Sequence, residues 1–293
     1  MLQYKYKYLM SKKLWEPSKE LIKNSNLFAY EKFISKYYKY NFSRNYKKLL
    51  KWSVKNPNDF WNSIWEYFEV VGEKTDKFKL TKDLINSKFF VNSKLNFAEN
   101  LLAKNSNQKA ITFVSENGYR EQKSWKELNI DVKKIITFYK KINISEKDRI
   151  AAYTPNQIET VECFLGASAI GSIWSSCSPD FGVPSVIERF SQIKPKLLVI
   201  TDKYYYNGKE INIIERLPKI LKKIKSIKSV LILNYPGKKL KKINKIKNIK
   251  IYNFTEIKKL EISRNKLKKF DFDHELAILY SSGTTGKPKC ICS

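Results

Sequence analysis

The stretch that decides the fold lies close to the last residue of the sequence. An apolar run leads directly into a loop of hydroxyls, glycines and cations: Leu276-Ala277-Ile278-Leu279-Tyr280, then Ser281-Ser282-Gly283-Thr284-Thr285-Gly286-Lys287-Pro288-Lys289. The apolar run predicts a buried strand. Gly283 and Gly286 permit positive φ, so backbone N–H groups can approach a ligand and form an anion-binding turn. Hydroxyl donors and two lysines complete a loop that is predicted to bind a polyphosphate.

The spacing of the glycines excludes a P-loop, because only two residues separate them and Pro288 stands where Ser or Thr would hold magnesium. The loop resembles instead the signature of the adenylate-forming superfamily. That signature reads two hydroxyl residues, Gly, two hydroxyl residues, Gly, any residue, Pro and Lys, and Ser281 to Lys289 match every fixed position. The alternative interpretation is a polar surface turn. The match at every fixed position, directly after a predicted strand, favours the phosphate loop over this alternative. Cys290 departs from the Gly that usually follows.

The formal charge of +29 raises the question of nucleic-acid binding. Lys greatly outnumbers Arg, whereas planar recognition of phosphate favours Arg. The lysines are also spread along the chain, with their highest density in residues 219–250, where interleaved Ile and Leu predict helix and strand with a solvated face. We therefore expect no nucleic-acid partner.

The remaining composition indicates a globular protein whose cysteines are reduced thiols. Hydrophobic residues make up 42% of the chain, enough to bury a core. The four cysteines and the single His274 have no zinc-ligand spacing, so no metal site is predicted and disulfides are not expected. Lys interrupts the apolar residues of the first segment, and no apolar run is long enough to span a bilayer. A cytoplasmic protein without a membrane partner is the expectation.

The sequence pattern divides the chain into a helical part, residues 1–97, and an α/β part, residues 98–293. Aromatic residues recur with helical spacing in 27–38 and 57–68, the second opened by Asn56 as N-cap and Pro57. Farther on, strands alternate with helices, which predicts βαβ units around a mostly parallel sheet. The expected strands are 110–114, 120–124, 149–153, 171–176, 196–201 and 229–233; the expected helices are 124–141 with a capping box at Ser124, 156–169, 184–192 and 211–223.

Several other segments resemble one branch of the superfamily. Lys51–Val54 and Asn56–Trp61 are similar to the N-terminal cap of acetyl-CoA-type synthetases, and Leu95–Leu102 to the segment that leads into the AMP-binding domain. Ile173–Gly182 and the Pro288-Lys289-Cys290 ending look specifically like the acetoacetyl-CoA synthetase family. From spacing alone, Trp174–Gly182 could equally be a tight structural turn.

The resemblance implies two half-reactions: ATP activates acetoacetate as an acyl-adenylate, and CoA then displaces AMP. Lys289 would be the catalytic cation, with Lys287 in support. Mg²⁺ would accompany ATP, and Lys209 would contact CoA phosphate. The residues implied to hold ATP and pyrophosphate are Ser281, Ser282, Gly283, Thr284, Thr285, Gly286, Lys287 and Lys289.

Family members continue beyond the loop into adenine-, ribose- and C-terminal catalytic segments, so the sequence predicts a chain that corresponds to the first part of such an enzyme. The expectation is that this chain alone does not complete the reaction. Two alternatives stay open: a synthetase for another short acid such as acetate or propionate, and a non-catalytic phosphate-binding remnant. Oligomeric state is not predicted.

Overall fold

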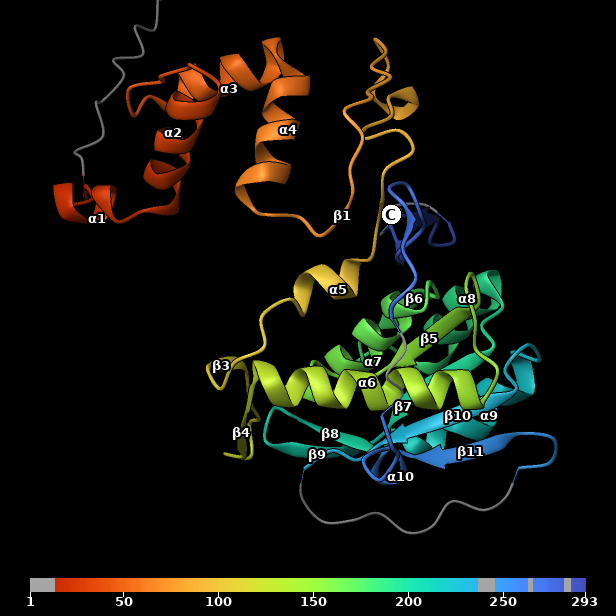
Figure 1. Cartoon of the computed structure of the whole chain (residues 1–293). Helices are drawn as coiled ribbons and strands as arrows, with labels where there is room; N and C mark the ends of the chain where they lie inside the picture. The colour runs from red at the N-terminus through yellow and green to blue at the C-terminus, as the bar shows by residue number, and fades with distance from the viewer. Residues whose placement is uncertain (1–13, 237–245, 263–265, 282–285) are drawn as a thin grey trace, which may run out of the picture. The chain divides into compact units, whose positions relative to one another are not determined.

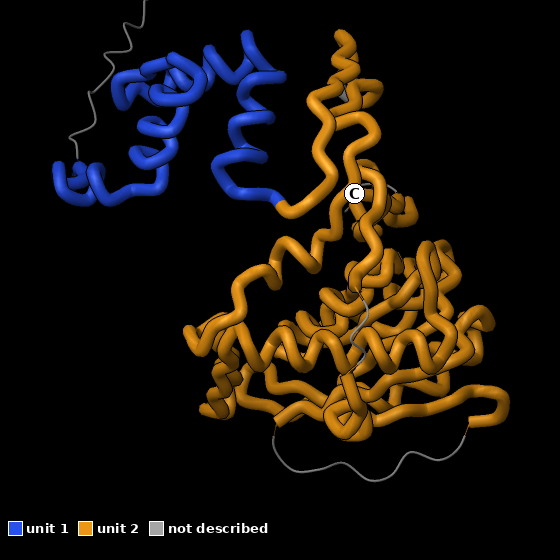
Figure 2. The backbone as a smooth tube through the Cα atoms, viewed as in Figure 1, with its two compact units in different colours: residues 1–70 blue, residues 71–293 orange. Residues whose placement is uncertain are grey.

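The computed structural model describes residues 14–236, 246–262, 266–281 and 286–293 (Figure 1). Its backbone divides into two compact units, residues 1–70 and residues 71–293 (Figure 2). This division falls earlier than the boundary at 97/98 that the sequence pattern predicts. No helix in the described part of the chain is both long and apolar enough to cross a membrane.

The first unit is helical, as the aromatic pattern predicts. Ser18, Ser25 and Asn45 each accept a backbone N–H and so cap the first three helices, whereas Asn56 occupies the N-cap of the fourth without a side-chain cap. The buried core consists of Tyr30, Ile34, Phe42, Leu49 and Trp52. The helices are α1 (Lys19–Lys23), α2 (Asn26–Tyr37), α3 (Tyr46–Lys55) and α4 (Pro57–Tyr67).

The segment between residues 71 and 96 forms short strands and a 3₁₀ helix where the sequence pattern predicts helices. It contains β1 (Gly72–Glu73), the 3₁₀ helix η1 (Leu84–Asn86) and β2 (Lys94–Leu95). Strand β2 pairs on one side with β1 and on the other with β12 (Phe270–Asp271), which explains why the segment belongs to the second unit. Its aromatic residues pack across loops, with Phe90 5.1 Å from Phe272 between ring centroids, rather than along a helix.

The second unit is built on a five-stranded parallel sheet with the order β11-β10-β7-β5-β6. In chain order these strands are β5 (Arg149–Tyr153), β6 (Ile173–Cys177), β7 (Leu197–Thr201), β10 (Ser229–Leu233) and β11 (Lys250–Asn253). The chain starts in the interior of the sheet, adds β6 on one side and then builds outward on the other. The strand order therefore reverses between β5 and β7, and ligands of such sheets bind at the carboxyl ends of the strands near this reversal.

Helices cover both faces of the sheet, as Figure 1 shows. Successive residues of β5 point to opposite faces: Ala151 and Tyr153 pack with α8 and α9, whereas Ile150 and Ala152 pack with α6, α7 and α10. Burial on both faces accounts for the near-continuous apolar character of the central strands. These helices are α6 (Trp125–Lys141), α7 (Ile158–Ala169), α8 (Val183–Ile193), α9 (Leu217–Lys223) and α10 (Phe254–Ile257).

Most of the predicted α/β elements are confirmed, including the Ser124 capping box and the hairpin around Asn117-Gly118. The predicted helix 211–223 is wrong in its first part, because residues 211 and 212 belong to a strand that pairs with the preceding one. The remaining elements are α5 (Phe97–Leu101), β3 (Lys109–Val114), β4 (Arg120–Ser124), β8 (Lys203–Tyr206), β9 (Lys209–Asn212), η2 (Ile214–Arg216), β13 (Ile278–Tyr280) and β14 (Cys290–Cys292).

A buried ion cluster joins the β3–β4 hairpin to the helical layer. The Nζ of Lys123 on β4 lies 2.5 Å from Oε1 of Glu162 on α7 and 2.6 Å from Oδ2 of Asp131 on α6. The side chain of Glu162 is fully buried, and that of Lys123 is 8% exposed. Removing one partner from such a cluster leaves an uncompensated charge in a medium that solvates it poorly.

We predict that Lys123→Met destabilises the second unit by about 3–5 kcal/mol, because Met keeps the aliphatic stem but leaves two carboxylates without their cation. Urea unfolding of the wild-type and variant chains measures the change. Lys126→Met is the matched control: Lys126 is exposed on the same helix as Asp131, and its replacement should alter stability by less than about 0.5 kcal/mol. Equal losses in the two variants would contradict the role of the cluster.

A second prediction concerns pH. Burial raises the pKa of Glu162 to about 7, against the opposing attraction of Lys123. The folded-state pKa of Glu162 lies above the unfolded value, so the folded protein favours the protonated carboxyl. The stability that the protonated carboxyl contributes is fully present below the unfolded pKa and is lost as the pH rises through about 7. The stability of wild type relative to Glu162→Gln should therefore fall between pH 4.5 and pH 8. Urea unfolding of both proteins at several pH values measures the difference in unfolding free energy. A difference that rises with pH would refute the raised pKa of Glu162.

Candidate active site

The hairpin that carries the predicted phosphate loop is attached to the edge of the parallel sheet. Trp174 of β6 donates its backbone N–H to the carbonyl of Leu276 at 3.1 Å and forms a parallel bridge with Ala277. The Oγ of Ser175 donates to the carbonyl of Ile278 at 2.8 Å. Because β13 runs parallel to β6, the loop that follows it begins at the carboxyl edge of the sheet, where ligands of such sheets bind.

Strand β14 closes the loop by pairing antiparallel with β13, so that Tyr280 lies opposite Cys290. The backbone N–H of Ser281 donates to the carbonyl of Lys289 at 3.0 Å, which fixes the two ends of the loop against each other. The predicted strand is confirmed in position but corrected in burial: Ile278 is buried, whereas the side chain of Leu279 is 56% exposed. The side chains of Leu279 and of its cross-strand partner Ile291 are both exposed, so one face of the hairpin is open.

The described part of the loop consists of Ser281 and Gly286–Lys289; the predicted residues Ser282, Gly283, Thr284 and Thr285 lie outside the described residues. Gly286 has φ +100°, a conformation in which any side chain would be strained. Lys287 and Lys289 are exposed, and neither forms an ion pair with another described residue. Both cations are thus accessible to an anionic ligand at this edge of the sheet.

Helix α8 contacts both arms of the hairpin. The guanidinium of Arg189 lies over the ring of Tyr280, 5.8 Å from its centroid, and 4.6 Å from that of Phe181. One turn farther along, Nε2 of Gln192 donates to the carbonyl of Pro288 at 3.1 Å, and the thiol of Cys290 lies 3.7 Å from Oε1 of Gln192. Sequence reasoning did not predict either helical residue, because neither lies in a recognisable motif.

The segment Trp174–Gly182 comprises β6 and the loop that follows it, and two side chains fix the loop. The hydroxyl of Tyr153, at the end of β5, donates to the carbonyls of Pro179 and Phe181 at 3.1 and 2.5 Å. The Nη1 of Arg216 donates to the same two carbonyls, at 3.1 Å each, and to the hydroxyl of Tyr153. Four hydrogen bonds thus hold the backbone of this loop, which also borders a cavity, so both interpretations of the segment stay open.

This cavity, of about 340 Å³, opens at the carboxyl ends of the strands. It lies beside β5, next to the reversal of strand order. The Oγ1 of Thr154 is buried without a hydrogen-bond partner among the described residues, so this cavity wall retains an unused polar atom. The lining residues are Thr154, Pro155, Asn156, Thr160, Ser176, Cys177, Ser178, Pro179, Asp180, Tyr204 and Tyr206.

Asp180 is the charged residue of this cavity wall. The hydroxyl of Tyr204 donates to Oδ1 of Asp180 at 2.6 Å, and the Oγ of Ser178 donates to Oδ2 at 2.8 Å. These hydrogen bonds, that of Tyr204 first, lower the pKa of Asp180. Burial, followed by the hydrogen bond to Asp180, raises the pKa of Tyr204. The pair thus holds a carboxylate anion and a neutral phenol at neutral pH, an arrangement suited to accepting N–H or O–H donors.

Lys209, predicted as a CoA contact, lies at the start of β9. Tyr206, which lines the cavity, is its partner across the hairpin. Asn207 and Gly208 both have positive φ, 50° and 71°, as a two-residue hairpin turn requires. This Asn-Gly pair is the signal that could have predicted the hairpin, and with it the late start of helix α9.

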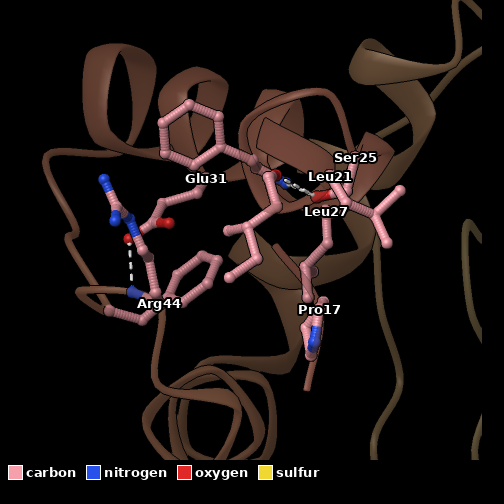
Figure 3. Close-up of a pocket in the computed structure, with 9 residues that line it drawn as sticks. Pro17, Leu21, Ser25, Leu27, Glu31 and Arg44 are labelled. Carbon is pink, nitrogen blue, oxygen red and sulfur yellow. Dashed lines mark hydrogen bonds between the residues drawn. The ribbon is translucent and has the colours of Figure 1, made fainter. Parts of the chain in front are cut away.

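A second cavity, also of about 340 Å³, lies within the helical unit (Figure 3). Its walls are mostly apolar, and Oε1 of Glu31 accepts the backbone N–H of Arg44 at 2.8 Å beside it. None of the predicted site residues lines this cavity. It is bordered by Pro17, Leu21, Ile22, Ser25, Leu27, Phe28, Glu31, Phe42 and Arg44.

The described residues do not provide a cage for Mg²⁺. No three side chains of His, Cys, Asp or Glu converge within the described ranges, whereas Mg²⁺ is usually held by carboxylates together with phosphate oxygens and waters. Mg²⁺ therefore remains a prediction, tied to a bound nucleotide rather than to these residues.

Comparison with known families matches this architecture. Residues 98–292 match the model of the AMP-binding enzyme family, and residues 46–101 match the acetyl-coenzyme A synthetase N-terminus. The chain belongs to the AMP-binding enzyme family. Both the fold class and the superfamily predicted from the loop Ser281–Lys289 are thus confirmed.

The relatives of this family member include acetoacetyl-CoA synthetases. The protein of Rhizobium meliloti (strain 1021) is 33% identical over 279 residues, 95% of this chain and 42% of the relative; that of Xenopus tropicalis is 36% identical over 258 residues, 84% and 38%. The structure of acetoacetyl-CoA synthetase from Streptomyces lividans is similar, with a TM-score of 0.86 and 26% identity over 96% of this chain and 43% of the other. The chain thus spans about two fifths of the length of these relatives, and the predicted resemblance is confirmed.

Proposed function

We propose that this chain belongs to an AMP-forming acid–CoA ligase that activates acetoacetate with ATP and transfers the acyl group to CoA. The observation that carries the proposal is the placement of the two described ends of the loop, Ser281 and Gly286–Lys289. This loop matches the family signature, is closed by β14 and begins at the carboxyl edge of the sheet, the edge at which the cavity lined by Thr154 and Asp180 also opens. The names of the relatives support the acid and the thiol acceptor.

In the first half-reaction a carboxylate oxygen of the acid attacks the α-phosphorus of ATP. The bond to the bridging oxygen breaks, and pyrophosphate leaves with that electron pair. The loop hydroxyls and N–H groups would hold the β- and γ-phosphates, so the protein contributes position and charge rather than a nucleophile. The hydrogen bond from the backbone N–H of Ser281 to the carbonyl of Lys289, at 3.0 Å, ties the backbone of Lys289 to the start of the loop, which supports Lys289 as the cation that meets the departing charge.

In the second half-reaction the sulfur of CoA attacks the acyl carbon. The thiol gives its proton to solvent, the thioester bond forms, and AMP leaves with the electron pair of the broken acyl–oxygen bond. Lys209 is suited to a phosphate of CoA by its charge and its position on the hairpin beside the cavity. The first half-reaction does not require Lys209, which makes the two roles separable by kinetics.

The class of acid has a second candidate. Malonamoyl-CoA synthetase of Penicillium aethiopicum is 28% identical over 302 residues, 95% of this chain and 40% of the relative. The malonamoyl and acetoacetyl groups share a carbonyl at the β position. We therefore propose acids with a β-carbonyl as the substrate class and acetoacetate as its preferred member. We also propose that the enzyme acts in the cytoplasm, because its four free cysteines are compatible with a reducing environment.

Substrate choice is tested in the full-length enzyme that contains this chain. Acetoacetate should give a higher kcat/KM than acetate or propionate for acid-dependent AMP formation in the presence of CoA, because β-carbonyl acids are the shared class. The kcat/KM for malonamate should lie below that for acetoacetate and above those for acetate and propionate. The specificity constants of the four acids, measured at one ATP and CoA concentration, decide the order. A preference for acetate would assign the protein to a different branch of the family.

The role of Lys289 is tested in the same enzyme by Lys289→Ala. Loss of a cation that meets developing phosphate charge should raise the barrier to adenylate formation by about 2–4 kcal/mol, by analogy with lost oxyanion donors. Acid-dependent exchange between pyrophosphate and ATP reports this step, and thermal unfolding should be unchanged because the side chain is exposed.

Two further variants sharpen this test. Lys289→Arg should recover part of the rate because it keeps the positive charge, and Lys222→Ala, an exposed lysine on α9, should behave as wild type. Wild-type exchange in Lys289→Ala would exclude the proposed role.

A further inference from the structure

Helix α8 bears two neighbouring side chains that contact opposite arms of the phosphate-loop hairpin. Arg189 and Gln192 are three residues apart, a spacing that places them on one face of a helix. Arg189 contacts Tyr280, the last residue before the loop, and Gln192 contacts Pro288 and Cys290 at its end. Opposing contacts on the entry and the exit restrict the separation of the two arms.

The α8 face is itself anchored in the sheet. Val186, Phe190 and Ile193 are buried in the core beneath it, so the helix cannot rotate without exposing apolar surface. Nε2 of Gln192 also donates to the carbonyl of Glu188 at 2.9 Å, and Nη1 of Arg189 donates to that of Ser185 at 3.1 Å. Each side chain is thus fixed to its own helix while it contacts the hairpin.

The two arms of the hairpin differ in their other attachments: Ile278 of the entry arm is buried in the core, whereas the exit arm has no buried residue. The entry arm meets β6 through one bridge and the hydrogen bonds of Trp174 and Ser175. The exit arm, β14, pairs with β13, and all three of its residues are exposed. Gln192 ties this end of the loop to α8 through two atoms: Nε2 donates to the carbonyl of Pro288, just before β14, and Oε1 accepts from the thiol of Cys290, the residue that departs from the usual glycine.

We infer that Arg189 and Gln192 are positioning residues that hold the entry and exit of the phosphate-binding loop at the separation that a nucleotide requires. The inference rests on the proposed function for its kinetic consequence, whereas its structural consequence can be measured without it. Arg189 also joins the loop to Phe181, so the segment that borders the cavity and the phosphate loop share one support.

The kinetic test uses Gln192→Met in the full-length enzyme. Met preserves side-chain length but removes the amide that donates to Pro288. Misplacement of the loop should raise the KM for ATP in acid-dependent pyrophosphate exchange by about tenfold, since that is the range for loss of one neutral hydrogen bond. The KM for the acid and the midpoint of thermal unfolding should change little. A residue that only stabilises the fold would instead lower the midpoint and would not affect the KM for ATP selectively.

Gln122→Met is the matched control, because Gln122 is exposed on β4 and lies opposite Thr112 in the hairpin. It should keep the KM for ATP within twofold of wild type. Arg189→Met should also raise the KM for ATP, and Arg189→Lys should restore part of the effect by keeping the cation near both rings. An unaltered KM for ATP in both Gln192→Met and Arg189→Met, in an enzyme whose wild type performs the exchange, would overturn the inference.

Hydrogen exchange of the 293-residue chain supplies the test that does not depend on activity. The amides of Ser281 and of β14 should exchange several-fold faster in Gln192→Met than in wild type, and at the wild-type rate in Gln122→Met. Unchanged protection in Gln192→Met would overturn the inference. The two assays separate the two proposals. If the full-length wild-type enzyme shows no exchange of pyrophosphate into ATP, but the amides of the 293-residue chain respond to Gln192→Met as expected, the proposed function fails and the positioning role stands.

Discussion

The parallel contact between β6 and the segment that enters the phosphate loop determines where this loop opens. The N–H of Trp174 and the hydroxyl of Ser175 bind successive parts of that segment. A parallel neighbour fixes direction as well as place, so the loop opens at the same edge as the ends of β5 and β6. An antiparallel contact would have directed the loop toward the opposite edge, away from the cavity and from Lys209.

The strand order gives this edge its chemical character. Because the order reverses between β5 and β7, the chain leaves the sheet in different directions there, and a cavity can open between the diverging connections. Thr154 follows β5, Asp180 follows β6 and Tyr204 follows β7, so each strand delivers a polar side chain to the same wall. The hydrogen bonds of Arg216 and Tyr153 to the intervening loop keep that wall in place.

The sequence was sufficient for the family and for most of the parallel sheet, because buried strands and amphipathic helices leave strong periodic patterns. It was insufficient where long-range pairing decides the structure. The sequence pattern predicts a helical part up to residue 97, but Phe90 in the segment 71–96 packs against Phe272, which is distant in the sequence. Residues 211 and 212 became a strand because the Asn207-Gly208 turn pairs them with β8. Gln192 and Arg216 act through contacts with carbonyls, which no local pattern records.

The excess of positive charge makes the location of anion binding the most direct question, since lysines elsewhere could attract phosphate without specificity. Titration of the isotopically labelled chain with pyrophosphate, at physiological salt and monitored by amide chemical shifts, answers it. We expect the largest and saturable changes at Ser281 and Gly286–Lys289, with smaller ones in the α8 turn that contains Gln192. Changes concentrated at the lysines of residues 219–228, or spread evenly over the lysine-rich surface, would contradict the assignment of the loop as the phosphate site.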